Sequence, residues 1–141
     1  YYLGFAVNDG ARYESGGGGM MSTVEDYLRF TAALANGGAF QGKRIIGRQT
    51  LTFMTADHTL DRPGRPPGLG FGLGFEVRTR VGDAALPGSV GDYYWGGAAS
   101  TVFWNDQVDD LWVVWATQLM PSTTFDFRGQ LRSLVYAAIT D

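Results

Sequence analysis

The sequence predicts an α+β fold, in which a largely antiparallel sheet is covered by helices. Apolar residues recur at helical spacing near both ends of the chain, within 22–38 and 124–138. Between them, the apolar residues alternate or run continuously, as they do in strands. The last two such runs are 98–104 and 111–119, and the short segment that separates them favours an antiparallel hairpin over a parallel crossover.

The N-terminal part is expected to supply a strand and then a helix. Residues 2–7 have the composition of a short strand. Ser22 and Glu25 have the spacing of a capping box, which predicts a helix that begins there. Asn36, followed by two glycines, is expected to end it. The apolar face of this helix would consist of Val24, Tyr27, Leu28, Thr31 and Leu34.

The middle of the chain is expected to be short elements joined by loops. Residues 42–47 are predicted to be extended or a turn, and 48–57 a short helix. The prolines within 58–68 predict a loop, because proline lacks an amide donor and fixes φ. Glycine alternates with larger apolar residues in 70–79, which predicts one strand with a bare face. A second loop is expected over 80–91.

The C-terminal part predicts a hairpin covered by a last helix. The run from Leu111 is continuously apolar through Ala116, as in a strand covered on both faces. Thr124 is a suitable cap for the final helix. We expect this helix to lie across the hairpin. Its apolar face would consist of Phe127, Leu131, Leu134, Val135 and Ala138.

Composition narrows the possible partners. The 141 residues suit a single domain over 1–141, and a net charge of −3 with scattered basic residues argues against nucleic acid. The chain has no cysteine, one histidine (His58) and no Gly-x-Gly-x-x-Gly or Walker loop, so we expect no metal and no cofactor. No apolar run approaches the roughly 20 residues of a membrane helix, so no membrane partner is expected. The cellular compartment is left open.

A self-contained nucleophile is not evident. Ser-x-x-Lys is absent, since the single lysine is Lys43 and Phe40 stands three residues before it. Tyr13-Glu14-Ser15 matches a Tyr-x-Ser pattern in letters, but it lies in a glycine-rich loop, and we interpret the match as accidental. His58 is interpreted as a surface or loop residue. Arg78 and Arg80 share a strand face and are expected to be solvated.

The triplet Trp95-Gly96-Gly97 permits two interpretations. Glycine in a strand marks a bulge or a close approach of something to the backbone. That approach could be tight packing beneath the last helix, or it could be a ligand. The residues alone leave both open.

Five segments, in this order, resemble the C-terminal part of the serine β-lactamase-related superfamily, nearest to the family VIII carboxylesterases. They are "GGGGMMSTVEDYLRFTAALANGG", "RIIGRQTLTFMT", "GFGLGFEV", "WGGAASTVFWNDQVDDLWVVWATQLMP" and "FRGQLRSLVYAAI". The resemblance implies a penicillin-binding-protein-like fold and an acyl-enzyme mechanism. It also implies a Ser-x-x-Lys nucleophile motif and a Tyr-x-Asn-like motif upstream of this region, and this chain has neither.

The resemblance assigns a role to the triplet. Lactamases have Lys-Thr-Gly at this place, and the esterases often have Trp-Gly-Gly. The backbone N–H that follows, here that of Ala98, would be one of two oxyanion donors. Trp95, Gly96 and Gly97 would bind substrate: the glycines would leave room for an acyl group, and the tryptophan would be an apolar wall suited to an uncharged ester.

We therefore expect the C-terminal part of a serine esterase, which supplies the oxyanion strand and the pocket wall and is inert alone. The substrate would be a small ester or a lactam-like compound. The other partner would be the N-terminal portion of the same polypeptide, or a second copy by self-association. The alternatives are a β-lactamase or D-amino-acid peptidase of the same superfamily, or a non-catalytic binding domain on the same scaffold.

Overall fold

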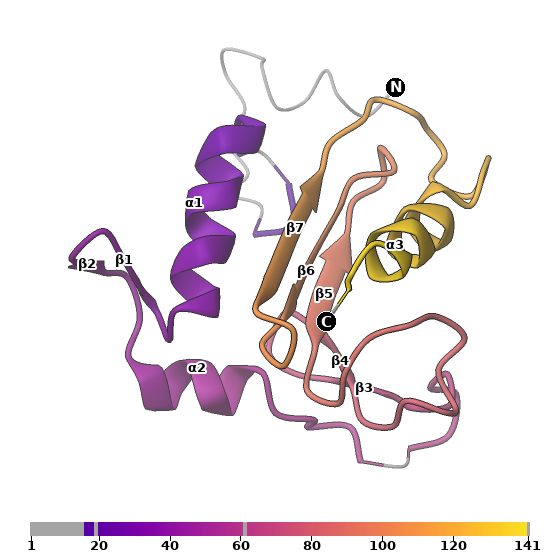
Figure 1. The fold of residues 1–141 in the computed structure, drawn as a ribbon, viewed down its shortest axis with the longest axis horizontal. Helices are drawn as coiled ribbons and strands as arrows, with labels where there is room; N and C mark the ends of the chain where they lie inside the picture. The colour runs from indigo at the N-terminus through magenta and orange to yellow at the C-terminus, as the bar shows by residue number, and fades with distance from the viewer. Residues whose placement is uncertain (1–15, 19, 61, 141) are drawn as a thin grey trace.

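The structure, a computed structural model, describes residues 16–18, 20–60 and 62–140. The strand predicted over 2–7 and the Tyr13 triplet lie outside these ranges. The elements follow in the order α1 (Val24–Ala35), β1 (Ala39–Phe40), β2 (Lys43–Arg44), α2 (Arg48–Met54), β3 (Leu69–Phe71), β4 (Glu76–Arg78), β5 (Tyr93–Gly96), β6 (Val102–Asp106), β7 (Leu111–Trp115) and α3 (Phe127–Ala137). β1 and β2 form a small hairpin. The other strands form one antiparallel sheet in the order β3-β4-β5-β6-β7 (Figure 1).

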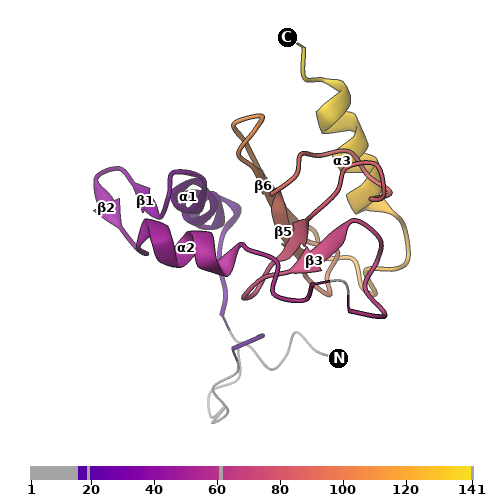
Figure 2. The same ribbon diagram turned by 90° about the horizontal axis from the view of Figure 1, so that it is seen from below.

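Helices cover both faces of this sheet, with α1 and α2 on one side and α3 on the other (Figure 2). Successive residues of a strand point to opposite faces. Tyr93 therefore joins the apolar cluster beneath α1 and α2, whereas the ring of Tyr94 lies under Arg132 of α3. The predicted α+β class and the C-terminal helix across the sheet are confirmed. Within the described ranges, no helix has the length and apolar character needed to cross a membrane.

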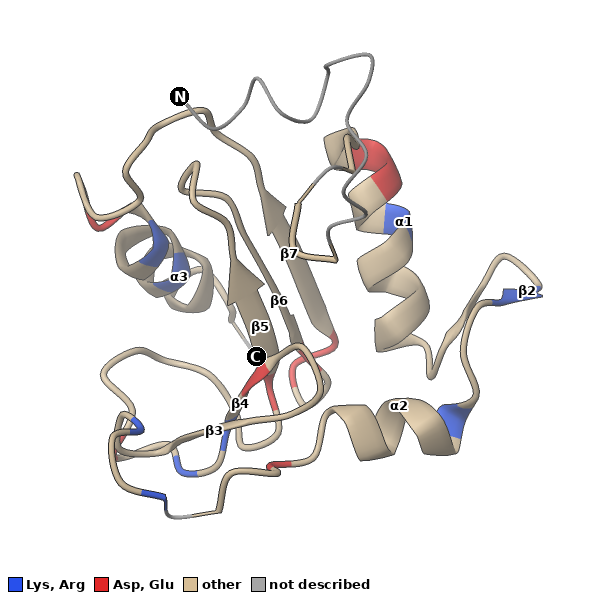
Figure 3. Cartoon of the chain, turned by 180° about the vertical axis from the view of Figure 1, so that it is seen from behind, with Lys and Arg blue, Asp and Glu red and all other residues tan. Residues whose placement is uncertain are grey.

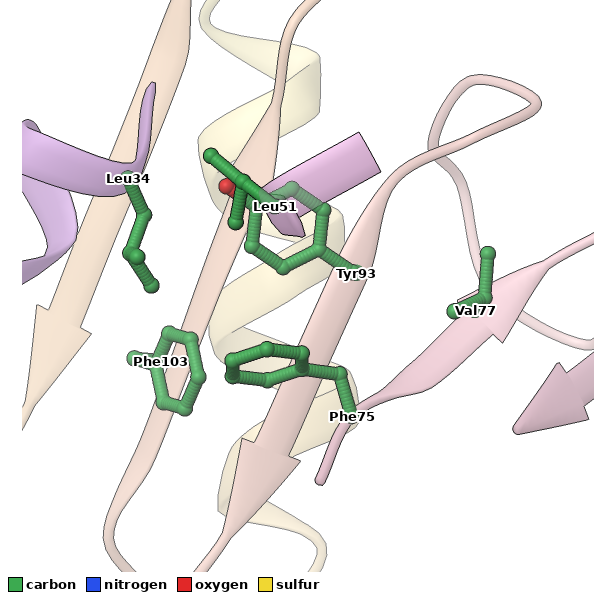
Figure 4. Close-up of a cluster of buried hydrophobic side chains, with 6 residues drawn as sticks. All are labelled: Leu34, Leu51, Phe75, Val77, Tyr93 and Phe103. Carbon is green, nitrogen blue, oxygen red and sulfur yellow. The ribbon is translucent and has the colours of Figure 1, made fainter. Parts of the chain in front are cut away.

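The main core lies between α1, α2 and the sheet. Its buried members are Leu34, Leu51, Phe75, Val77, Tyr93 and Phe103 (Figure 4). The ring of Phe75 lies 5.3 Å from that of Tyr93 and 5.9 Å from that of Phe103, between centroids. The buried amide of Asn105 donates to the Thr31 carbonyl at 3.1 Å and to the Tyr93 hydroxyl at 2.9 Å. These two bonds tie α1 to β6 and β5.

The cap of α1 differs from the prediction by one residue. Thr23 is the N-cap, and its Oγ1 accepts a hydrogen bond from the Asp26 amide at 3.1 Å. Ser22 instead donates to the Thr23 carbonyl. The predicted pair of Ser22 with Glu25 is therefore wrong, because Thr23 and Asp26 offer the same spacing one residue later. The helix ends at the Asn36 C-cap, as predicted.

The predicted apolar face of α1 is confirmed only in part. Thr31 and Leu34 are buried, and Tyr27 packs against the core. Val24 and Leu28 are exposed. The helix therefore contacts the sheet along a narrower stripe than its sequence suggests.

The single strand predicted over 70–79 is wrong. The segment is a hairpin of β3 and β4, joined by a turn in which the Gly72 amide donates to the Phe75 carbonyl at 2.8 Å. Gly74 has a φ of +101°, a conformation that other residues rarely adopt. The alternating glycines thus indicate a turn rather than a strand with a bare face.

The strand predicted over 98–104 begins instead at Val102, and residues 97–101 form the turn that joins β5 to β6. The antiparallel hairpin of β6 and β7 is confirmed. β6 is buried throughout, but β7 is only half-buried and ends in Trp115, which is 41% exposed. The prediction that β7 is covered on both faces is therefore wrong. β7 is the edge strand of the described sheet, so fewer residues pack around it.

The last helix begins later than predicted. Its N-cap is Asp126, whose carboxylate accepts from the Gly129 amide at 3.0 Å. Thr124, the predicted cap, instead donates to the Pro121 carbonyl at 2.8 Å.

The face of α3 that meets the sheet is more polar than predicted. Leu134, expected on the buried face, is 70% exposed, whereas Arg132 is buried. The Arg132 guanidinium lies 5.4 Å from the ring centroid of Trp104. Arg78, expected to be solvated, is buried in the same layer and pairs with Asp92. The layer beneath α3 therefore relies on paired charges and aromatic rings.

Candidate active-site hollow at the end of β5

Trp95 is the last large side chain of β5. It is 48% exposed, and its ring meets that of Phe71 edge to face at 5.1 Å between centroids. Alternation along the strand places Trp95 on the same face as Tyr93, the face that α1 covers. An aromatic ring held on one side and open on the other can contact a ligand.

A hollow of about 440 Å³ opens beside Trp95, between the start of α1 and the ends of β5, β6 and β7. We call it the Trp95 hollow. Its lining side chains include those of Met20, Tyr27, Trp95, Phe103 and Trp115. Gly96, Gly97 and Thr101 also line it. Burial raises the pKa of the Tyr27 hydroxyl, so this group stays neutral at ordinary pH. None of the described lining residues carries a charge.

Ala98 lies in the turn that follows. The Gly97 amide donates to the Thr101 carbonyl at 3.0 Å, and the Ser100 amide donates to the Gly97 carbonyl at 3.2 Å. The pairing of β5 with β6 stops at Gly96 and Val102. Ala98 is exposed, and within the described part of the chain its N–H has no hydrogen-bond acceptor. That amide is therefore free of the sheet ladder, next to a glycine that lines the Trp95 hollow.

The structure explains why glycine stands at positions 96 and 97, a question that the sequence left open. A Cβ on Gly96 would lie 2.5 Å from Cζ of Arg128, a side chain of α3. A Cβ on Gly97 would overlap the hydroxyl of Thr101. The missing side chains thus make room for protein atoms, and the close packing beneath the last helix is real. The expected space for an acyl group is not the reason for Gly96, although the backbone of both glycines still borders the hollow.

The other polar residues considered from sequence do not contribute to the Trp95 hollow. Lys43 is exposed on β2. His58 packs its ring on Phe53, and its Nε2 lies 2.7 Å from the Phe53 carbonyl oxygen. In the described residues, no group of three or more histidine, aspartate or glutamate side chains gathers at a metal-binding distance.

Sequence reasoning missed two residues next to the triplet. Arg128 donates to the Gly97 carbonyl, and Thr101 fills the space beside Gly97. Figure 3 shows the basic positions of α3 beside the sheet. Arg128 lies 31 residues after Gly97, so no local pattern links them. The only sequence signal was the pair of glycines itself, which indicates that something approaches the backbone.

The structure is an α+β domain with helices on both faces of one antiparallel sheet, and the comparisons specify its family. A model of the β-lactamase family matches residues 3–137, so the chain belongs to the β-lactamase family. Two curated relatives from Mycobacterium tuberculosis, "Protein Rv1367c" of strain H37Rv and "Uncharacterized protein MT1414" of strain CDC 1551, are each 31% identical over 121 residues. Each match covers 78% of this chain and 30% of the relative.

Solved structures agree with this family. EstCE1, described as a hydrolase with promiscuous acyltransferase activity, superimposes with a TM-score of 0.75 at 27% identity. The match covers 93% of this chain and 34% of EstCE1. Simvastatin synthase (LovD) from Aspergillus terreus matches at a TM-score of 0.64 and 18% identity, over 82% of this chain and 34% of that one, and supports the fold. The chain thus spans about a third of the length of these proteins.

Proposed function

We propose that this chain is the oxyanion-strand and pocket-wall part of a serine hydrolase that acts on esters through an acyl-enzyme. One observation carries the proposal: the exposed amide of Ala98, free of the sheet ladder, stands at the end of the Trp95 triplet beside an apolar hollow. A fixed backbone donor of this kind stabilises negative charge that develops on a carbonyl oxygen.

The chemistry proceeds in two acyl transfers. A serine hydroxyl from outside this chain attacks the ester carbonyl and loses its proton to a neighbouring base, while the carbonyl oxygen becomes negative. The N–H of Ala98 donates to that oxygen. The C–O bond to the alcohol breaks, the alcohol leaves with a proton, and the acyl group stays on serine. Water then loses a proton to the base and attacks the same carbonyl, the bond from the acyl group to the serine oxygen breaks, serine regains a proton, and the acid product leaves.

The lining of the Trp95 hollow favours a neutral substrate. Its volume of about 440 Å³ lies within the usual range for small-molecule sites. A lactam with a carboxylate would require a cation, and no lysine or arginine is among the described lining residues. Trp95 instead presents an apolar surface. EstCE1, by its description a hydrolase with acyltransferase activity, is consistent with an acyl substrate.

We also propose that β7 pairs with the N-terminal portion of the polypeptide, or with a second copy of the chain. In the described sheet β7 is paired with β6 along one edge and with no strand along the other, and Trp115 at its end is exposed. An open strand edge of this kind favours association. Sedimentation of the chain at high concentration tests this point: an oligomer supports it, and a monomer that binds no N-terminal portion contradicts it.

The experiment compares this chain alone with a longer polypeptide that carries a Ser-x-x-Lys motif upstream of Tyr1. With a short-chain aryl ester, the longer protein is expected to release the aryl alcohol in an initial burst, and a serine-directed reagent should block that burst. The chain alone is expected to be inert. A burst from the chain alone would contradict the proposal that the nucleophile lies outside this chain. A reading frame without Ser-x-x-Lys upstream would favour the non-catalytic binding domain.

The Trp95→Lys variant distinguishes ester from lactam chemistry. The new cation would attract a carboxylate, so the ester activity of the longer protein should fall. A gain of lactam turnover in this variant would favour the β-lactamase branch instead. Trp95→Phe is the matched control, because it keeps an apolar ring at the same place.

A further inference from the structure

Arg128 reaches from the first turn of α3 to the backbone of the Trp95 triplet. Its Nη2 donates a hydrogen bond to the Gly97 carbonyl. The guanidinium occupies the space that a side chain at position 96 would need. A Cβ on Gly96 would lie 2.5 Å from Cζ of Arg128 and 2.8 Å from each of its terminal nitrogens. Glycine at position 96 is thus the condition for this contact, because any Cβ there would displace the arginine.

The acceptor of this bond belongs to the same peptide group as the proposed oxyanion donor. The Gly97 carbonyl and the Ala98 N–H share one planar unit, and a trans peptide points the two in opposite directions. The oxygen is held from two sides, by Arg128 and by the Ser100 amide. With the oxygen fixed toward α3, the Ala98 N–H is fixed away from α3.

Among the described residues, no carboxylate pairs with Arg128. Arg78 and Arg132 on the same face both pair with Asp92. Arg128 has no ion pair with any described acidic residue, and its Nε is buried without a described hydrogen-bond partner. A cation on the oxygen side of a peptide group polarises that group, and its N–H becomes a stronger donor.

We propose that Arg128 is the positioning residue that orients and polarises the Gly97–Ala98 peptide for oxyanion stabilisation. This inference rests on the proposed function, since it assumes that the Ala98 amide meets the developing charge. Arg128 acts through the peptide and does not touch the substrate. Gly96 contributes to the same arrangement, because its lack of a side chain leaves space for the Arg128 guanidinium.

The first test measures the peptide itself and requires no activity. Amide and carbonyl NMR shifts of Gly97 and Ala98 are compared in this chain, in Arg128→Met and in a control, Arg29→Met, whose arginine is exposed on α1. Arg128→Met should move the Gly97 carbonyl and Ala98 amide signals and speed amide exchange at Ala98. Arg29→Met should leave them in place. Unchanged signals in Arg128→Met would overturn the inference.

The second test uses the longer, ester-hydrolysing protein. Because the donor remains and only its orientation and polarity are lost, Arg128→Met should lower kcat about tenfold to a hundredfold with KM nearly unchanged. Arg128→Lys keeps the charge and should recover part of the loss. Gly96→Ala should give a similar kcat defect, and the Gly96→Ala/Arg128→Met pair should be less than additive, because both remove one contact.

The outcomes separate the two proposals. If the unchanged longer protein hydrolyses no ester, the proposed function fails, whatever the NMR signals show. If it is active and Arg128→Met keeps its kcat, or the double variant is fully additive, the role of Arg128 fails and the proposed function stands. Urea unfolding of each variant identifies any loss that comes from the fold, and Gly96→Ala then decides, since it keeps the Arg128 residue and breaks only its contact with the Gly97 carbonyl.

Discussion

Arg78 Nε donates to Asp92 Oδ2 at 2.8 Å, and both side chains are almost fully buried beneath α3. Arg132 donates to the same oxygen. Arg78 also donates to the Leu86 carbonyl at 2.8 Å, and Arg132 Nε to the Pro87 carbonyl at 2.6 Å. This cluster attaches the loop between β4 and β5 to α3, and so helps to hold β5, which carries Trp95.

Arg78→Met should destabilise the fold strongly. It leaves Asp92 with one guanidinium in a buried site, and breaking a buried pair by removing one partner costs about 3–5 kcal/mol. Arg80→Met is the matched control, because Arg80 pairs with Asp83 at the surface; its effect should be within about 1 kcal/mol. Urea unfolding measures both. Equal effects for the two variants would contradict the importance of burial.

Gly70→Ala should also be destabilising. A Cβ at Gly70 would overlap the carboxylate of Asp57, which accepts from the Phe71 amide at 3.1 Å. Overpacking of this kind costs about 1–3 kcal/mol. Gly82→Ala is the control, since open space surrounds Gly82 and its φ is not left-handed. That variant should be neutral or slightly more stable, and a Gly70→Ala variant as stable as Gly82→Ala would refute the contact.

Asp57 should contribute to acid unfolding. The Thr59 hydroxyl, together with the amides of Thr59 and Phe71, holds the pKa of the Asp57 carboxyl below its ordinary value of 3.8. A carboxyl with a lowered pKa stabilises the fold above 3.8, and this contribution disappears as the pH falls through the lowered pKa.

Unfolding free energies of Asp57→Asn, measured from neutral pH into this acid range, should therefore fall less steeply than those of the unchanged chain. Thr59→Val, which removes the hydroxyl donor, should give an intermediate slope. Identical slopes in all three proteins would show that Asp57 does not contribute.

Thr23→Ala should destabilise α1. Its hydroxyl oxygen accepts from the Asp26 amide, and loss of an N-cap side chain costs typically about 1 kcal/mol. Ser22→Ala, at the position that sequence alone favours, should have little effect. The difference in urea midpoint between the two variants measures this. A larger loss in Ser22→Ala would restore the original assignment of the cap.

Local patterns predicted the elements whose signals lie within a few residues. The end of α1 at Asn36, the short helix α2 and the hairpin of β6 and β7 all follow from such signals. The errors at Ser22 and Thr124 arose where a second capping side chain stands close by. The predicted strand over 70–79 failed because alternating glycine fits both a strand and a turn.

Contacts between distant residues were not predictable. Arg78 has a partner 14 residues away in Asp92, and Asp92 has another 40 residues further on in Arg132. Without that knowledge, an arginine on a short strand is expected in solvent. The Trp95 triplet was recognisable, but the side chain that requires its first glycine comes from α3. The sequence therefore indicated a candidate site and did not explain how its residues pack.

The most direct test of the account is Ala98→Pro in the longer, ester-hydrolysing protein. Ala98 is the second residue of the Gly97–Ser100 turn, a position where proline is favoured, so the change removes the N–H with little effect on the turn. Ala98→Gly is the control that keeps the N–H. The account predicts that kcat of Ala98→Pro falls about 10²–10³-fold at unchanged stability, while Ala98→Gly stays active. An Ala98→Pro variant with normal kcat would contradict it.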